Sequence, residues 1–428
     1  MIAVVNAGTP EAEALFAAQD ARRAADQAEV RRAVTEILAA VRTEGWEAVG
    51  RFSLRFDGAE PYELSPEQRR AAAAQCDPAV YEALERAARR IRDYQEKLLV
   101  RSREWDAPGG GRVGALVRGL TRVGLYVPGG TAAYPSSVLM NALPARVAGV
   151  EELIMVTPPT AHLRPAVLAA AELAGVDRVF ALGGAQAVAA LAYGAGPVPR
   201  ADKIVGPGNA YVAEAKRQLY GLIDIDMVAG PSEIMVLADG SAPVSYIAAD
   251  LLSQAEHDPR AASVLVTTDR TVADAVAGEL TLQLAALSRR DIAEASLRDF
   301  GAAVVCADWA EAADIANRLA PEHLEIMTEN PRALLPLIRN AGAVFLGPYS
   351  PEPLGDYMAG PSHVLPTSGT ARFFSPLSVD AFLKKTSLIE FDRAALAPLA
   401  ADIRALSLSE GLDAHANAIR VRTSEIRS

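Results

Sequence analysis

The spacing of apolar and polar residues along this 428-residue chain changes near residue 119. Before that point, three stretches carry apolar side chains three and four positions apart, which is the spacing of amphipathic helices. They are rich in Ala, Arg and Glu, and they cover residues 11–19, 28–43 and 79–100. The pattern predicts an N-terminal helical segment over residues 1–118, and no catalytic constellation lies within it.

From about residue 119, short apolar runs alternate with helical stretches. The runs are residues 153–156, 178–181, 203–205 and 223–227, and helical stretches lie near residues 136–148, 165–174, 185–193 and 210–220. This alternation is typical of a parallel sheet covered by helices. It predicts an α/β lobe over residues 119–232.

The same alternation continues after residues 229–233, which we interpret as a hinge. Apolar runs at residues 233–237, 263–267, 302–306 and 343–347 predict a second lobe over residues 233–383. The fold class is therefore α/β, with two Rossmann-like lobes of parallel sheet covered by helices. The cleft between such lobes is a usual place for a small-molecule site.

Residues 384–428 form the C-terminal tail, whose apolar side chains are too scattered for an independent core. It carries Glu410 and His415, separated by Gly411. A structural tail seldom needs both residues, although a surface acid and histidine are common enough to leave that alternative open.

Glycine-rich turns occur at four places. Residues 109, 111 and 114 match the dinucleotide fingerprint, but no strand precedes them and no helix follows, so we predict a hairpin or loop there. The other three turns follow strands of the first lobe, at residues 126–130, 183–186 and 206–209. Ligands of open α/β sheets bind beyond the carboxyl ends of strands, where helix N-termini offer N–H groups to phosphate oxygens. These turns favour a nucleotide site over ordinary tight turns.

The stretch from residue 250 to residue 258 combines acidic, amide and imidazole side chains. We predict one helix over residues 245–257, on which Gln254 and His257 share a face. This resembles half of a metal site, and a helix C-terminus with an unrelated histidine remains the alternative.

Three later stretches strengthen the metal interpretation, at residues 320–325, 355–363 and 410–415. The chain has five histidines, and all but His162 lie in these stretches or beside Gln254. Together they offer a mixed nitrogen and oxygen ligand set that would suit zinc, manganese or cobalt: Gln254, His257, Asp356 and His415.

Glu322 and His323 are adjacent and follow Pro321. Because proline favours the first turn of a helix, we expect this pair at a helix N-terminus facing the cleft. A carboxylate beside an imidazole supplies two proton-transfer groups suited to near-neutral pH. A capping acid beside a surface histidine is the structural alternative.

Composition and charge bear on the partners of the protein and on its compartment. The formal net charge of −11 argues against nucleic acid or an anionic membrane as a partner. The only two cysteines, Cys76 and Cys306, are far apart, which indicates a reducing compartment. No secretory signal or membrane-spanning run is present, so we expect a cytoplasmic protein.

A nucleotide-binding lobe opposite a lobe with metal and base residues suggests hydride transfer coupled to proton removal. Two other classes stay open. One is a metal hydrolase whose glycine-rich loops bind a phosphorylated substrate, and the other is a catalytically silent dimer that senses a nucleotide or an amino acid.

The chain resembles the histidinol dehydrogenase family over most of its length. The motifs that carry the resemblance begin with Glu44-Gly-Trp-Glu-Ala48, Arg55-Phe-Asp-Gly58, Tyr126-Val-Pro-Gly-Gly130, Gly183-Gly-Ala-Gln-Ala187 and Gly206-Pro-Gly-Asn-Ala-Tyr-Val212. They continue with Ile225-Asp-Met-Val-Ala-Gly-Pro-Ser-Glu233, Asp250-Leu-Leu-Ser-Gln-Ala-Glu-His257, Ala320-Pro-Glu-His-Leu-Glu325, the run from Gly355 to Thr367 and Ser409-Glu-Gly-Leu-Asp-Ala-His415. One small departure is Ser362, where the family usually has Asn.

The resemblance implies oxidation of L-histidinol by two NAD molecules, through histidinal, to L-histidine. It implies that Tyr126, Gln186 and Asn209 bind NAD. It also implies that Glu322 and His323 are the acid/base pair. The implied zinc ligands are Gln254, His257, Asp356 and His415, and with them Ser232, His323, His363 and Glu410 would bind the substrate.

The resemblance further implies a homodimer in which the C-terminal tail of each chain reaches the site of its partner. His415 and Glu410 would then act in the other subunit. In chemical terms, an open-sided zinc could hold the imidazole and amine of histidinol and so position its carbinol carbon against the nicotinamide.

Overall fold

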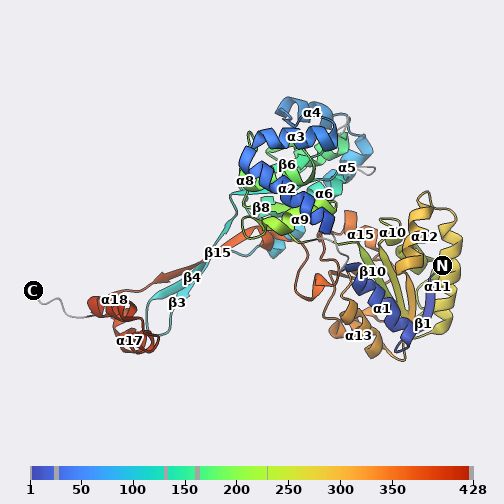
Figure 1. Cartoon of the computed structure of the whole chain (residues 1–428). Coiled ribbons are helices and arrows are strands. Elements are labelled where there is room, and N and C mark those ends of the chain that lie inside the picture. Colours follow the sequence, from blue (N-terminus) through green and yellow to red (C-terminus); the bar gives the residue numbers. More distant parts are fainter. Residues whose placement is uncertain (1, 24–27, 130–133, 160–163, 229, 424–428) are drawn as a thin grey trace, which may run out of the picture.

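The protein folds into two α/β lobes and a long arm that projects from the first lobe (Figure 1). The structure is a computed structural model and describes residues 2–23, 28–129, 134–159, 164–228 and 230–423. Gly130 of the first glycine-rich loop and Ala229 of the expected hinge lie outside these residues. The predicted fold class, with two lobes of parallel sheet covered by helices, is confirmed.

The first lobe is built on a six-stranded sheet. Its strand order is β2 (Tyr62–Glu63), β7 (Arg178–Ala181), β6 (Glu152–Thr157), β5 (Arg122–Tyr126), β8 (Lys203–Val205) and β9 (Asp224–Ile225). All of these pair in parallel except β2, which is antiparallel to β7. The runs are apolar throughout because both faces of the sheet are buried under helices.

Helices cover both faces of this first sheet. One face packs against α2 (Ala28–Glu44), α3 (Trp46–Asp57), α8 (Gly184–Tyr193) and α9 (Ala210–Leu219). The other packs against α4 (Pro66–Ala73), α5 (Pro78–Leu98), α6 (Pro135–Val147) and α7 (Pro165–Ala174).

The second lobe has a six-stranded sheet that is parallel throughout. Its order is β1 (Ala3–Asn6), β12 (Ala302–Val305), β11 (Ala262–Thr267), β10 (Glu233–Ala238), β13 (His323–Met327) and β14 (Ala343–Leu346). One face is covered by α10 (Val244–Ala255), α11 (Arg270–Leu284) and α12 (Arg290–Phe300), and the other by α1 (Pro10–Arg23) and α13 (Trp309–Leu319).

The N-terminal segment expected over residues 1–118 is helical over much of its length, but it does not form a layer of its own. Strand β1 is the edge of the second sheet, and α1 packs on the same lobe. Helices α2 to α5 instead cover the first lobe. The physical reason is that an amphipathic helix is stable only when its apolar face meets another apolar surface.

The chain returns to the first lobe before it enters the arm. The short helix α14 (Pro331–Leu334) precedes β14, and α15 (Glu352–Tyr357) follows it. Leu377, Val379 and Phe382 then join the core of the first lobe, and Val379 N donates a hydrogen bond to Gln95 Oε1 at 2.8 Å. This return path ties the two lobes together.

The arm is a three-stranded antiparallel ribbon that ends in helices (Figure 1). Strand β4 (Arg112–Gly119) pairs with β3 (Arg103–Asp106) on one side and β15 (Leu383–Glu390) on the other. Residues 107–111 turn between β3 and β4, so the predicted hairpin is confirmed. The tip carries α16 (Arg393–Leu396), α17 (Ala400–Ser409) and α18 (Asp413–Thr423).

Short 3-10 turns complete the described elements, at η1 (Leu335–Leu337), η2 (Thr370–Arg372), η3 (Val379–Phe382) and η4 (Ala397–Leu399). Within the residues that the structure describes, no helix combines the length and apolar character needed to cross a membrane.

Candidate functional site

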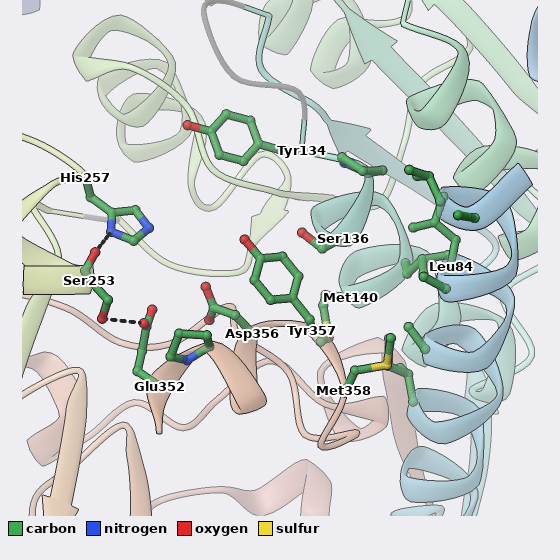
Figure 2. Close-up of a pocket in the computed structure, with 18 of the residues that line it drawn as sticks. Leu84, Tyr134, Ser136, Met140, Ser253, His257, Glu352, Asp356, Tyr357 and Met358 are labelled. Carbon is green, nitrogen blue, oxygen red and sulfur yellow. Dashed lines mark hydrogen bonds between the residues drawn. The ribbon is translucent and has the colours of Figure 1, made fainter. Parts of the chain in front are cut away.

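A cavity of about 790 Å³ lies between the two lobes (Figure 2). Helices α5 and α6 of the first lobe form an apolar wall, with Leu84 and Met140 among its residues. The opposite side is polar and comes from the second lobe, where Ser253, Glu352 and Asp356 line the cavity. The site therefore combines a surface for an apolar group with a cluster of charged and hydrogen-bonding groups.

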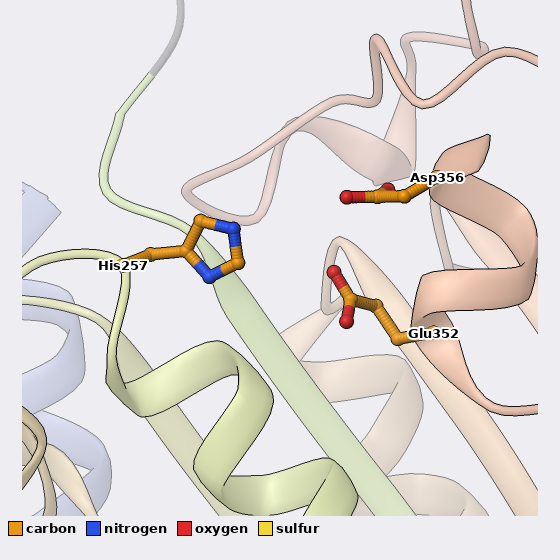
Figure 3. Close-up of side chains that lie close together, drawn as sticks. All are labelled: His257, Glu352 and Asp356. Carbon is orange, nitrogen blue, oxygen red and sulfur yellow. The ribbon is translucent and has the colours of Figure 1, made fainter. Parts of the chain in front are cut away.

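His257 lies in the turn that follows α10, rather than on the helix. The predicted helix over residues 245–257 is too long, because α10 ends at Ala255 and Asp258 precedes Pro259, a position that disfavours helical backbone. The argument that Gln254 and His257 share one helix face is therefore wrong. The His257 side chain instead projects from the turn toward α15 (Figure 3).

Three side chains converge at this point. Ligand atoms of His257, Glu352 and Asp356 all lie within 4.8 Å of one another. Figure 3 shows the two carboxylates projecting from α15 toward the imidazole ring. Burial raises the pKa of Asp356 to about 6, and the nearby His257 opposes that shift. Imidazole nitrogen and carboxylate oxygen together form a donor set that suits a divalent transition metal ion.

The hydrogen bonds of His257 leave one ring nitrogen available. Its Nδ1 lies 2.8 Å from the carbonyl oxygen of Ser253, which can only accept, so Nδ1 carries the hydrogen. The lone pair is then on Nε2. An imidazole whose other nitrogen donates to a carbonyl is the usual arrangement of a metal-binding histidine.

Gln254 is buried, with 1% of its surface exposed. Among the described residues, no group donates a hydrogen bond to its Oε1. A buried amide oxygen without a partner costs free energy unless a ligand or ion satisfies it. This unpartnered oxygen on α10 is consistent with the ligand role expected for Gln254.

Glu322 and His323 lie at the start of strand β13 and not at a helix N-terminus, so that prediction is wrong. Pro321 follows Ala320, which ends α13 in the left-handed conformation at φ 47°, and the apolar run after it is strand β13. Both side chains are nonetheless buried beside the cluster, with exposed fractions of 6% and 4%.

His323 is held as a neutral imidazole with one free nitrogen. Its Nδ1 donates to the carbonyl oxygen of Glu233 at 3.2 Å, and its Nε2 has no hydrogen-bond partner in the described residues. Burial lowers the pKa of His323 to about 4. A neutral imidazole with a free Nε2 can accept a proton from a bound hydroxyl group.

Glu322 lies beside His323, with its Oε2 3.8 Å from the histidine Nδ1. The backbone N–H of Glu233 donates to the same Oε2 at 3.1 Å. Burial raises the pKa of Glu322 well above its usual range, while hydrogen bonds from Glu233 and Ser232 oppose that shift. The expected substrate-binding residue Ser232 thus contacts the acid/base pair directly.

His363 connects the lobes at the edge of a second cavity. This cavity, of about 320 Å³, is lined by His323, Asp356 and His363 among other residues. His363 Nδ1 lies 3.0 Å from the carbonyl oxygen of Asp356, and its Nε2 lies 3.2 Å from the hydroxyl of Ser137 on α6. Because Asp356 lines both cavities, the acid/base pair and the charged cluster belong to one site.

The expected nucleotide residues lie at the carboxyl edge of the first sheet, in a different lobe. Tyr126 ends β5, and its hydroxyl accepts a hydrogen bond from Gly184 N at 3.1 Å. Gln186 is 1% exposed, and no group in the described residues donates to its Oε1. Asn209 caps α9, because its Oδ1 accepts from the N–H groups of Tyr211 and Val212.

The third glycine-rich turn approaches the first closely. Gly206 has φ +113°, and a Cβ at this position would lie 2.1 Å from the carbonyl oxygen of Tyr126. Only glycine allows the turn after β8 to lie against the end of β5. Tyr126, Gln186 and Asn209 are therefore grouped at one edge of the sheet, as the sequence predicts.

The structure does not bring Glu410 and His415 to the other site residues. Glu410 ends α17 and His415 lies on α18, at the tip of the arm and far from both lobes (Figure 1). Both side chains are exposed.

Comparisons with known proteins decide the family. The family model described as histidinol dehydrogenase matches residues 20–423. Histidinol dehydrogenase of Heliobacterium mobile is 54% identical over 94% of this chain and 95% of its own, and that of Moorella thermoacetica is 55% identical over 91% and 93%. A crystal structure of histidinol dehydrogenase from Elizabethkingia anophelis covers 100% of this chain and 99% of its own, with a TM-score of 0.94 and 32% identity.

The chain belongs to the histidinol dehydrogenase family. The resemblance inferred from the sequence motifs is thereby confirmed. Ser362, the one departure from the family motifs, is buried, and its hydroxyl accepts a hydrogen bond from Val364 N at 3.1 Å.

Two residues of the site were missed by the sequence reasoning. Glu352 belongs to the cluster with His257 and Asp356, and its spacing of four residues from Asp356 would have placed both on one helix face. Asp57 lies beside Gln186 at the carboxyl edge of the first sheet, with its Oδ2 3.5 Å from Gln186 Nε2. It is part of the motif from Arg55 to Gly58, but nothing in its local pattern indicates that contact.

Proposed function

We propose that this protein oxidises L-histidinol through L-histidinal to L-histidine, with two molecules of NAD and one zinc ion at each site. Membership of the family supports the substrate. The observation that carries the mechanism is the placement of Glu322 and His323 beside the cluster of His257, Glu352 and Asp356, in a cavity between the lobes.

The residues present fit a zinc ion. His257 offers Nε2, Asp356 a carboxylate and Gln254 a buried amide oxygen without a partner, and Glu352 lies close enough to join them. When bound, zinc supplies a Lewis acid that holds and polarises polar groups of the substrate. Manganese has similar preferences for oxygen ligands and is the alternative ion.

His323 is the proposed base for the alcohol oxidation. Its Nε2 accepts the hydroxyl proton while a hydride leaves the carbinol carbon for the nicotinamide ring. The hydrogen bond from Nδ1 to the Glu233 carbonyl keeps the lone pair on Nε2 and fixes the ring plane. This is general base catalysis by an imidazole that burial keeps neutral.

Glu322 is the proposed base for the second oxidation, which requires water to add to the aldehyde. A carboxyl whose pKa is raised well above its usual range is a stronger base than an ordinary carboxylate, so it can accept a proton from water and release it again. Hydrogen bonds from Glu233 N and Ser232 hold the side chain.

The carboxyl edge of the first sheet is the proposed NAD site. Helices α8 and α9 begin there, and the partial positive charge of a helix N-terminus favours phosphate oxygens. Gln186 Oε1 and the Tyr126 hydroxyl supply further polar contacts. The nicotinamide would then enter the cavity between the lobes and meet the substrate there.

We also propose a homodimer in which His415 and Glu410 act in the partner's site. The arm carries these residues away from their own lobes, and its tip exposes Leu406 and Leu408 by 65% and 50%. Grouped exposed apolar side chains are typical of a surface that another protein covers. Two-fold symmetry would make the exchange reciprocal, so each site would combine residues of both chains.

The direct test is the amount of NADH formed for each histidinol consumed, with and without a chelator. We expect two NADH for each histidinol, little free histidinal, loss of activity with EDTA and recovery with Zn²⁺ or Mn²⁺. One NADH with accumulation of aldehyde would contradict the role of Glu322. Full activity of metal-free protein would contradict the metal site, and an absence of NADH would favour a hydrolase.

A further inference from the structure

Two buried carboxyl groups that the proposed chemistry does not use lie directly beneath the charged cluster. Asp250, on α10, is 7% exposed, and Glu325, on β13, is 1% exposed. Their side chains hydrogen-bond each other. Neither is in an ion pair with a lysine or arginine among the described residues, which makes this an unusual use of two acidic side chains.

The contact requires a proton. Two ionised carboxylates have only acceptor oxygens and repel each other, so a hydrogen bond between them forms when one is protonated. In the described residues, no N–H or alcohol hydroxyl donates to Glu325 Oε2. Burial raises the pKa of Asp250 to about 6 and that of Glu325 well above its usual range.

Asp250 and Glu325 connect the elements on which the site residues lie. Asp250 is one helical turn before Gln254 on α10, and Glu325 is two residues after His323 on β13, so it faces the same side of the sheet. Glu325 Oε1 accepts a hydrogen bond from Glu352 N, at the first turn of α15, at 2.8 Å. Glu325 therefore holds α15 by its N-terminus.

A second contact links α15 back to α10. The Ser253 hydroxyl lies 3.0 Å from Glu352 Oε2 and 2.8 Å from the carbonyl oxygen of Asp250. Helix α10, strand β13 and helix α15 are thus joined in a ring of hydrogen bonds. Because α15 carries both Glu352 and Asp356, the ring determines where the two carboxylates lie relative to His257.

We propose that Asp250 and Glu325 are positioning residues: a buried carboxyl pair that, through the hydrogen bond from Glu352 N to Glu325, holds α15 in the register that the metal site requires. The inference rests on the proposed metal role of His257 and Asp356. Neither carboxyl contacts the ion or the substrate. Each acts through the backbone and side chain of Glu352, in the way that outer groups orient the ligands of a metal site.

The test compares two replacements of Glu325 that differ only in their hydrogen bonding. In Glu325→Gln, the amide NH₂ can donate to Asp250 and the amide oxygen can still accept from Glu352 N. In Glu325→Leu, a side chain of similar size can do neither. Each variant is purified as the full chain, and its affinity for Zn²⁺ is measured by competition with a chromogenic chelator. The absorption spectrum of the Co²⁺-loaded protein reports the ligand geometry.

We expect Glu325→Gln to bind Zn²⁺ within about threefold of the unchanged protein and to keep the Co²⁺ spectrum. We expect Glu325→Leu to bind Zn²⁺ roughly 10- to 100-fold more weakly, with an altered Co²⁺ spectrum. Ser296→Ala is the matched control. It removes a buried hydrogen bond in the same lobe, from Ser296 Oγ to the Ala261 carbonyl at 2.8 Å, and should lower stability without changing the Co²⁺ spectrum.

Two results would overturn the inference: unchanged Zn²⁺ affinity and Co²⁺ spectrum in Glu325→Leu, or equal damage in Glu325→Gln and Glu325→Leu. Should Glu325→Leu fail to fold, Glu325→Asp replaces it, because its shorter side chain withdraws the carboxyl from Glu352 N. The Zn²⁺ affinity and the Co²⁺ spectrum of that variant then test the inference. If the unchanged protein itself binds no Zn²⁺, the proposed metal function fails, and that outcome is separate from any effect of the variants.

Discussion

The two lobes share an architecture, but their candidate ligand-binding residues lie at opposite edges of their sheets. In the first lobe, Tyr126, Gln186 and Asn209 follow the carboxyl ends of strands. In the second lobe, Ser232 precedes β10, His257 precedes β11, and His323 begins β13. Under the proposed function, the rule that open α/β sheets bind ligands beyond their carboxyl ends would therefore describe only the first lobe.

The difference follows from the charges that the two edges present. The carboxyl edge of the first lobe carries the N-termini of α8 and α9, whose partial positive charge suits the phosphates of a dinucleotide. The amino edge of the second lobe presents the C-terminal end of α10 together with Glu352 and Asp356, which suit a cation. Opposite edges of similar sheets would thus suit the anionic cofactor and the metal ion of the proposed function.

Loss of the proton acceptor should have the largest effect on the chemistry of the second lobe. We expect His323→Asn to slow both oxidations by about 10² to 10⁴-fold, because the alcohol proton loses its acceptor. Glu322→Gln should slow oxidation of added histidinal far more than that of histidinol, since only the aldehyde step needs activated water. Stopped-flow NADH formation from each substrate measures the difference.

The exposed Glu329→Gln, just beyond the end of β13, is the control for these two variants and should behave like the unchanged protein. Equal slowing of both half-reactions by Glu322→Gln would count against its role with water.

Mixed dimers should show whether the second lobe is completed by the partner's arm. Gln254→Ala and His415→Ala homodimers should each be nearly inactive. Co-expression should restore about a quarter of full activity, because half of randomly paired dimers are mixed and each has one intact site of two. Differently tagged subunits allow the mixed dimers to be isolated and assayed.

The controls for this experiment are the two homodimers purified in the same way. If mixed dimers are present and remain inactive, His415 acts in its own chain and the proposed exchange of arms is wrong.

The charge of the cluster predicts how zinc binding depends on pH. The pKa of Asp356 is about 6 in the metal-free protein, and zinc binds the ionised carboxylate. The proton must therefore leave on binding at pH values below 6. We expect the zinc affinity to fall roughly tenfold for each pH unit below that value and to vary less above it. Chelator competition between pH 5 and pH 8 measures this dependence, and Asp356→Asn should flatten it.

The smallest expected effect concerns the first lobe. Asp57 Oδ2 lies 3.5 Å from Gln186 Nε2, and this contact fixes which way the unpartnered Oε1 of the amide faces. Asp57→Ala should raise the KM for NAD by about tenfold, the equivalent of one hydrogen bond, with unchanged zinc content. Glu60→Gln, an exposed carboxylate nearby in the sequence, is the control. An unchanged KM would show that Asp57 does not orient Gln186.

Much of this organisation could be predicted from the sequence, because it depends on local patterns. Apolar runs alternating with helical stretches identified both sheets, and the glycine turns identified the carboxyl edge of the first sheet, where we propose the nucleotide site. The placement of His323 could not be predicted in this way. Pro321 suggested a helix, and the strand that follows is recognisable only from its pairing with β10, which lies 90 residues earlier in the sequence.

Contacts between distant segments could likewise not be predicted from local patterns. Strand β1 joins β12 across almost 300 residues, and Glu352 meets His257 only because the return path of the chain places α15 beside the end of α10. Such pairings are decided by tertiary packing rather than by propensity.

The division of binding between the lobes can be tested most directly by measuring two ligands on the same two variants. NADH binding is followed by fluorescence and zinc content by metal analysis, in Gln186→Ala and in His257→Ala. We predict that Gln186→Ala loses NADH affinity and keeps its zinc, while His257→Ala loses zinc and keeps its NADH affinity. Loss of both ligands in both variants, with the fold intact, would contradict separate sites at opposite sheet edges.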